Sequence, residues 1–282
     1  MLAQREQIKG AFLWSLLQVF SERVVQAILF FVIAKLLGPE DLGVASIAVT
    51  ISAIATYIMQ GVVQYVVQIR DDSERHLSAL FAIAIAVSLC MSASAAVGGH
   101  LLARALDAEQ LIGLSYVCAL SPLAAALGAI PEGLLIRRFE FRILALRKPI
   151  GVTLAGICCV LLALAGYGAW SVVIQSVFTT FITSFICVIG SKWRPSARFT
   201  LSDSLKCASG SLKLMLNLAA DVLSHRAPEL IIGIAIGASA VGYFRVAKSL
   251  YDLVISISLF PLSSVLLPIY SRGSEEGSAK KF

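Results

Sequence analysis

Long stretches of apolar, almost uncharged residues recur along the whole chain, and no other feature restricts its fold as strongly. A helix that crosses the hydrocarbon core of a membrane needs about 20 such residues in a row. Charged residues make up only 14% of the 282 residues, against about 25% in soluble domains. The sequence therefore predicts an all-α protein, a polytopic bundle of membrane-spanning helices rather than a globular domain with one anchor.

The apolar stretches predict about eight spanning helices, joined by short turns or by short basic loops. None of the connections is long enough to form a folded extramembrane domain. The predicted spans are Ala11 to Leu37, Leu42 to Ile69, Leu80 to Leu102, Leu111 to Ile136, Ile150 to Ala165, Ala169 to Gly190, Leu212 to Ile236 and Val241 to Tyr270.

The basic residues alternate with the spans. Of the 23 lysines and arginines, 17 lie before the first span, in the even-numbered loops or in the C-terminal tail, including Arg142, Arg147 and Lys148 in the fourth loop. By the positive-inside rule, the N-terminus is expected to be cytoplasmic. We expect a multi-pass protein of the bacterial inner membrane. The first helix is expected to be retained, because no cleavage site follows its basic start. The net charge of +6 is thus explained by topology and not by a nucleic-acid partner.

A repeated turn indicates how the helices are organised. Gly38 and Gly43 lie in an apolar-Gly-x-x-x-apolar-Gly turn, and Gly237 and Gly242 lie in a second one, 199 residues later. The seventh span then corresponds to the first. Residues 1–200 are predicted to form a six-helix lobe, and residues 201–282 the first two helices of a second, pseudo-symmetric lobe. Because two full copies would exceed 282 residues, the chain is expected to be truncated.

Ionisable side chains inside the predicted spans are candidate functional residues. Each one costs about 2.5 to 3.5 kcal/mol at a helix centre if it faces lipid, so these groups must face protein or water. Those in the first span lie ~17 Å deep, near the middle of the bilayer. The side chains at positions 221, 225 and 229 have i, i+4, i+8 spacing, which predicts one stripe along a helix face. The nine residues are Glu22 and Arg23 in the first span, Asp221, His225, Arg226 and Glu229 in the seventh, and Arg245, Lys248 and Asp252 in the eighth.

One interpretation is that these charges neutralise one another and only fix helix packing. Arg226 would pair with Glu229 at i+3, Lys248 would pair with Asp252 at i+4, and Glu22 would pair with a neighbouring helix.

The other interpretation is a hydrated cavity between the two lobes, in which the cations bind the substrate. Guanidinium groups bind phosphate with two parallel hydrogen bonds, so a lipid-linked diphosphate fits such a site. The cations are Arg23, Arg226, Arg245 and Lys248, while Glu22, Asp221, His225, Glu229 and Asp252 would pair with charges or couple an ion.

The sequence contains no pattern typical of catalysis. No nucleophile-base pair, pair of catalytic carboxylates, metal cluster or phosphate-binding glycine loop stands out, so we expect no enzyme, no cofactor and no bound metal. The six cysteines fall mostly within apolar segments without metal-ligand spacing and are interpreted as small apolar fillers.

Four segments carry a resemblance to a known family: Leu36 to Gly43, Arg137 to Arg142, Gly166 to Trp170 and Lys192 to Pro195. Together they resemble the lipopolysaccharide and exopolysaccharide flippases (Wzx-like) of the multidrug, oligosaccharidyl-lipid and polysaccharide exporter superfamily, over nearly the whole chain. The resemblance implies twelve or more helices in two lobes that alternate access for an undecaprenyl-diphosphate-linked glycan. It also implies a cationic central cavity, which maps onto the four cations above, and glycan polymerase or glycosyltransferase partners. The chain departs from the family in length, since the last four or more helices are missing.

Two alternatives remain open. A cation-coupled multidrug exporter of the same superfamily would place acidic and aromatic groups in its cavity, whereas the charges here lean basic. A membrane-embedded glycosyltransferase or polymerase would need a sizeable extramembrane loop with acidic catalytic residues, whereas the loops here are short and basic.

Overall fold

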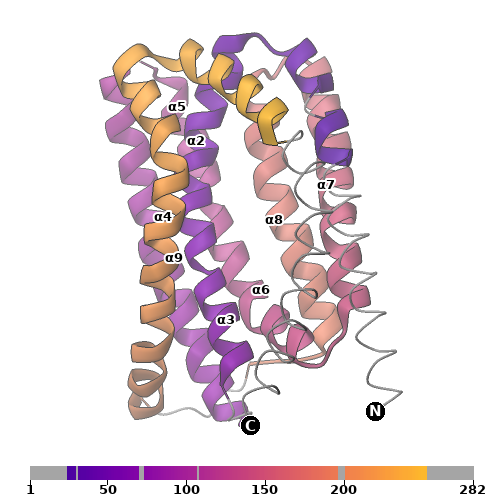
Figure 1. Cartoon of the computed structure of the whole chain (residues 1–282), viewed down its shortest axis with the longest axis vertical. Helices are drawn as coiled ribbons and strands as arrows, with labels where there is room; N and C mark the ends of the chain where they lie inside the picture. The colour runs from indigo at the N-terminus through magenta and orange to yellow at the C-terminus, as the bar shows by residue number, and fades with distance from the viewer. Residues whose placement is uncertain (1–23, 30, 70–72, 107, 196–200, 253–282) are drawn as a thin grey trace, which may run out of the picture.

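The computed structural model describes residues 24–29, 31–69, 73–106, 108–195 and 201–252, which form helices and no strands. Residues 24–29 and 31–36 are helical before the first labelled helix, and residues 238–252 are helical after the last one. The labelled helices are α2 (Pro39–Ile58), α3 (Gln60–Gln68), α4 (Glu74–Ala105), α5 (Gln110–Cys118), α6 (Leu120–Arg137), α7 (Phe141–Leu164), α8 (Ala169–Ser191) and α9 (Leu201–Ile236) (Figure 1).

Five helical stretches are long and apolar enough to cross a membrane, and they coincide with the second to sixth predicted spans. Two of them are pairs of helices that run on with only a one-residue break, α2 with α3 and α5 with α6. This confirms the predicted all-α, multi-pass bundle. Most of the first predicted span and the end of the eighth lie outside the described residues, so the total of eight stays a prediction. The five stretches are Pro39–Gln68, Glu74–Ala105, Gln110–Arg137, Phe141–Leu164 and Ala169–Ser191.

The prediction was wrong about where the fifth span begins. It assigned Arg142, Arg147 and Lys148 to a loop, whereas α7 begins at Phe141 and includes all three. Arg147 is only 8% exposed and donates a hydrogen bond to the carboxylate of Glu132 on α6. A buried cation is tolerated in this helix because the carboxylate opposite neutralises it.

Helix α9 begins at Leu201, before the predicted start of the seventh span at Leu212, and it ends at Ile236 as predicted. Its C-terminal half carries Asp221, Arg226 and Glu229, and the helix is not among the five stretches that are long and apolar enough to cross a membrane.

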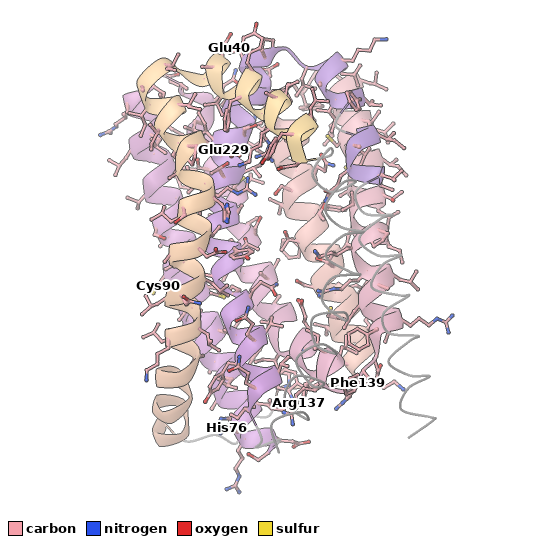
Figure 2. All side chains as sticks on the ribbon, in the orientation of Figure 1. Glu40, His76, Cys90, Arg137, Phe139 and Glu229 are labelled. Atoms are coloured by element: carbon pink, nitrogen blue, oxygen red, sulfur yellow. The ribbon has the colours of Figure 1, made fainter. Side chains whose placement is uncertain are left out.

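The connections alternate between the two ends of the bundle, as the predicted topology requires. His76, Arg137 and Phe139 lie near one end, which we call the basic end, and Glu40 lies near the other, which we call the turn end (Figure 2). Glu229 lies in the half of the bundle closer to the turn end (Figure 2).

Two apolar clusters attach α9 and the helix after it to the preceding helices. Met215 of α9 is 2% exposed and packs with Met59 and Ile130, close to Gly61 of α3. At the turn end, Val241 is fully buried in a cluster with residues of α2, α5 and α8. Small residues at such contacts let membrane helices approach closely.

The two repeated glycine turns pack against each other. A Cβ placed on Gly43 would lie 1.8 Å from the carbonyl oxygen of Ala238, and a Cβ placed on Gly242 would lie 2.1 Å from that of Pro39. In the 199-residue repeat, Pro39 corresponds to Ala238 and Gly43 to Gly242. The contact is therefore reciprocal, as at a two-fold axis. Each glycine lets the beginning of its helix approach the backbone at the beginning of the equivalent helix.

This contact predicts that Gly43→Ala destabilises the protein. The new methyl group would collide with the Ala238 backbone, and overpacking of this kind costs about 1 to 3 kcal/mol. The measurement is thermal unfolding in detergent. Gly98→Ala on α4 is the matched control, because no atom lies within 4 Å of the added Cβ and alanine is the better helix former. Equal unfolding temperatures for the two variants would contradict the reciprocal contact.

Candidate functional site

The candidate site is organised around Glu229, whose side chain has no exposed surface. The hydroxyl of Thr50, also fully buried on α2, donates a hydrogen bond of 2.5 Å to one carboxylate oxygen. A carboxylate at such a position is tolerated only where positive charge and hydrogen bonds replace its water.

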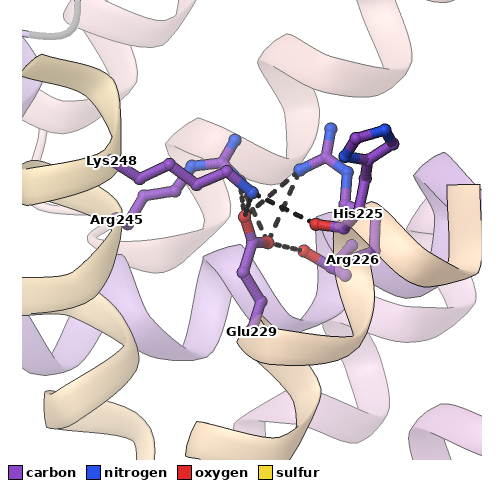
Figure 3. Close-up of polar contacts among 6 residues, drawn as sticks. His225, Arg226, Glu229, Arg245 and Lys248 are labelled. Atoms are coloured by element: carbon purple, nitrogen blue, oxygen red, sulfur yellow. Dashed lines mark hydrogen bonds and ion pairs between the residues drawn. The ribbon is translucent and has the colours of Figure 1, made fainter. Parts of the chain in front are cut away.

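Three cations supply that positive charge (Figure 3). Lys248 Nζ lies 3.0 Å from Oε1 of Glu229, and Arg245 Nη1 lies 3.2 Å from both carboxylate oxygens. Arg226 Nη1 is the most distant, at 3.4 and 3.5 Å. We call these four side chains the Glu229 cluster.

The local sequence explains why these side chains meet. Arg226 precedes Glu229 by three residues on α9, and Lys248 follows Arg245 by three on the next helix, so each pair shares a helix face. Gly237 joins the two helices with a φ of +114°, a conformation that favours glycine. The chain therefore turns back and brings the second pair over Glu229.

The backbone of α9 adds a further acceptor to the cluster. The carbonyl group of His225 accepts a hydrogen bond of 3.3 Å from Lys248 Nζ. Lys248 thus contacts α9 through both a side chain and the backbone.

The Glu229 cluster is not electrically neutral. One carboxylate faces three cations, which gives the cluster a formal charge of +2. The side chains of Arg226, Arg245 and Lys248 are 29%, 29% and 27% exposed, whereas that of Glu229 is fully covered. The negative charge is therefore buried and paired inside the protein, whereas the cations that carry the surplus positive charge remain partly exposed.

A polar cavity of about 220 Å³ lies beside the cluster, and Arg226 contributes to its wall. The hydroxyl oxygens of Thr56 and Ser121 are buried in this wall and have no hydrogen-bond partner among the described residues. Unpartnered buried hydroxyls are expected to bond to water or to a ligand. The wall comes from α2, α3, α6, α8 and α9 and consists of Ser52, Ala53, Thr56, Tyr57, Gln60, Ser121, Ser176, Thr180, Val222 and Arg226.

The structure brings together three of the four predicted cations. Arg226, Arg245 and Lys248 all contact Glu229, and the predicted pairing of Arg226 with Glu229 is present. Arg23 and Glu22 lie outside the described residues.

Two of the predicted arrangements were wrong. Asp221 and His225 are exposed and lie 3.8 Å from each other, apart from the buried Glu229. At 3.6 residues per turn, a side chain eight positions along is rotated by about 80°, so the stripe does not hold one face. Within residues 201–252, Lys248 pairs with Glu229 and makes no ion pair with Asp252, which is exposed.

The sequence analysis missed two buried contacts. Thr50 gave no signal, because a single hydroxyl group in an apolar helix is common. Glu132 could have been found, since a carboxylate inside the fourth predicted span also needs a cation. Its partner Arg147 additionally donates to the sulfur of Cys187, at 3.0 Å.

We predict that Thr50→Val lowers the stability of the protein. The substitution keeps the shape of the side chain but removes a hydrogen bond to a buried charged group, which costs about 1.5 to 3 kcal/mol. Thr180→Val is the matched control, because among the described residues the Thr180 hydroxyl bonds only to the Ser176 carbonyl of its own helix, at 3.0 Å. Thermal unfolding of both variants in detergent checks this prediction, and a loss in Thr180→Val as large as in Thr50→Val would contradict it.

Comparisons with known proteins bear on this geometry. The sequence model of a family described as polysaccharide biosynthesis protein matches residues 32–281. The succinoglycan biosynthesis transport protein ExoT of Rhizobium meliloti (strain 1021) is 24% identical to this chain over 264 residues. That alignment covers 92% of this chain and 53% of the relative, so the chain spans about half the relative's length. No solved structure matches the chain.

These matches confirm the resemblance to polysaccharide exporters inferred from the four sequence segments. The family match extends from the helix before α2 through the last helix described here, and it includes every member of the Glu229 cluster. This chain belongs to the polysaccharide biosynthesis protein family.

Proposed function

We propose that this chain is part of a transporter that moves a lipid-linked oligosaccharide across the inner membrane for lipopolysaccharide or exopolysaccharide biosynthesis. The observation that carries the proposal is the surplus positive charge of the Glu229 cluster beside a polar cavity within a membrane bundle. Ionisable groups within a membrane protein generally mark a substrate or ion path. The relative named as a succinoglycan biosynthesis transport protein supports the same class of activity.

The charge of the site favours an anionic head group. Arg226 and Arg245 offer planar guanidinium groups that match the oxygens of a phosphate, and Lys248 adds a compact point charge. Glu229 holds the three cations together without cancelling them. An undecaprenyl-diphosphate-linked glycan carries its negative charge next to the sugar, so the cluster would bind the diphosphate while the polar cavity admits the sugar.

The remaining predicted residues have supporting roles in this proposal. Arg23 would add a fourth cation from the first helix, with Glu22 as its neighbour. The exposed pair of Asp221 and His225, together with Asp252, would serve charge pairing or ion coupling.

The reciprocal contact of the two glycine turns supports the proposed lobes, residues 1–200 and 201–282. A two-fold related contact at the turn end gives both lobes an equivalent helix start about which to rock. Alternating access would then open the cavity to one side of the membrane at a time. The excess of basic residues in the even-numbered loops supports a basic end that faces the cytoplasm.

The alternatives are less well supported. A multidrug exporter would have to bind cationic compounds, and a cluster with a formal charge of +2 would repel them. A glycosyltransferase or polymerase would need a catalytic carboxylate that reaches its substrate, but the carboxylate of Glu229 is enclosed by its own cations. We therefore propose a transporter that works with polymerase or glycosyltransferase partners and is not itself an enzyme.

We predict that Arg245→Gln lowers glycan export at least tenfold. A charge-assisted hydrogen bond contributes about 1.5 to 3 kcal/mol, which corresponds to roughly 10- to 100-fold in binding. The measurement is the glycan exported by cells that depend on this protein, normalised to the protein in the membrane. Arg245→Lys keeps the charge and should retain part of the export.

Lys213→Gln is the matched control, because Lys213 is an exposed cation on α9 outside the cluster. It should export like the wild type. Undiminished export by an Arg245→Gln/Lys248→Gln double variant at normal membrane abundance would refute the proposed role of the cluster.

A further inference from the structure

Two further cavities lie toward the basic end, away from the Glu229 cluster. One is an apolar groove of about 300 Å³ between α4, α6 and α8, and the other is a basic pocket of about 370 Å³ next to the helix ends. Trp193 lines both of them, so the two cavities lie next to each other at this residue. Neither shares a lining residue with the polar cavity beside Arg226.

The groove is open and apolar. Leu127 of α6 is 43% exposed and Phe185 of α8 is 65% exposed, while Ala124 at the base is fully buried. Large exposed apolar side chains at the level of the membrane face lipid. A hydrocarbon chain lying in this groove would cover them.

The basic pocket next to the groove carries positive charge. Arg137 and Arg138 line it together with a single carboxylate, that of Glu74, over a floor that includes Leu77. One guanidinium nitrogen of Arg138, Nη1, donates to the Ser191 carbonyl at 3.0 Å. Because a guanidinium group has five N–H donors, this contact orients Arg138 and leaves donors for an anion.

Trp193 carries the clearest sign that something else binds here. Its indole nitrogen is buried and has no hydrogen-bond partner among residues 73–106, 108–195 and 201–252. The ring is held in place by an edge contact with Phe81, at 5.7 Å between centroids. A buried indole N–H usually has an acceptor, and the one missing here would lie beside the residue that lines both the groove and the basic pocket.

Trp193 lies just beyond the end of a helix that is long and apolar enough to span a membrane. It follows the end of α8 at Ser191 by two residues, and α4 begins at Glu74 on the other side of the pocket. Tryptophan is enriched where the apolar core of a membrane meets water, and basic pockets between membrane helices attract anionic head groups.

We propose that this groove and pocket bind one anionic phospholipid of the surrounding membrane. One acyl chain lies along Leu127 and Phe185, and the phosphate accepts hydrogen bonds from the Trp193 indole and from Arg138. The site is distinct from the cavity beside Arg226, with which it shares no lining residue, and its Arg137 lies near the basic end, whereas Glu229 lies in the half closer to the turn end (Figure 2).

The experiment measures retention of phosphatidylglycerol by the purified full-length protein, using native mass spectrometry at a series of lipid concentrations. Phosphatidylcholine with the same acyl chains tests the need for anionic charge, and inorganic phosphate tests the need for the chain. We expect phosphatidylglycerol to bind at least tenfold more tightly than phosphatidylcholine, and free phosphate not to displace it at comparable concentrations.

Three variants test the assigned contacts. Arg138→Gln should weaken phosphatidylglycerol binding roughly tenfold, since it removes a charge-assisted bond. Trp193→Phe keeps an aromatic ring but loses the indole donor, and it should weaken binding severalfold. Leu127→Trp fills the groove and should weaken binding of both phospholipids. Arg142→Gln is the control, because Arg142 is an exposed cation at the same end that lines neither cavity.

Three results would overturn the proposal. These are equal binding of the two phospholipids, equal effects of Arg138→Gln and Arg142→Gln, and displacement of the lipid by phosphate alone. Retention of undecaprenyl phosphate in place of phosphatidylglycerol, lost in Leu127→Trp, would also overturn it and would assign the groove to the substrate. Since the readout is lipid binding, none of these results depends on whether the protein transports a glycan.

Discussion

A carboxylate without exposed surface, inside a bundle built to lie in a membrane, must be surrounded by positive charge. Glu229 meets this requirement with three cations and the hydroxyl of Thr50. Removing one partner from such a buried group is expected to cost several kcal/mol, because a charge is left without compensation. The arrangement therefore fixes the position of the helix that carries Arg245 and Lys248 relative to α2 and α9.

Two backbone features make this arrangement possible. The turn at Gly237 directs the chain back over α9, and the Gly43 and Gly242 contacts allow the two equivalent helix starts to touch. The same packing leaves Arg226 at the wall of a polar cavity whose hydroxyls at Thr56 and Ser121 lack partners among the described residues. Surplus charge and unpartnered hydroxyls thus lie side by side.

Much of the fold was predictable because apolar length and basic-loop alternation are direct consequences of the bilayer. The convergence of Arg226, Arg245 and Lys248 was also anticipated, since intramembrane charges cannot face lipid. Their common partner, Glu229, was not anticipated. Lys248 was expected to pair with Asp252 at i+4, whereas the turn at Gly237 places Lys248 over Glu229. Arg147 was misplaced for a similar reason, as only the fold shows that Glu132 lies opposite it. The stripe from Asp221 to Glu229 failed because helical spacing drifts over eight residues.

The central claim is that Glu229 leaves uncompensated positive charge facing a water-filled cavity. It is tested most directly by cysteine labelling of Ser176→Cys, a residue of the cavity wall, in a chain whose six native cysteines are replaced. Reaction rates of an anionic and a cationic methanethiosulfonate are each divided by their rates with a small thiol in solution. The account predicts that the anionic reagent reacts severalfold faster on this scale, and that Arg226→Gln reduces the difference. Equal normalised rates, or a faster cationic reagent, would contradict it.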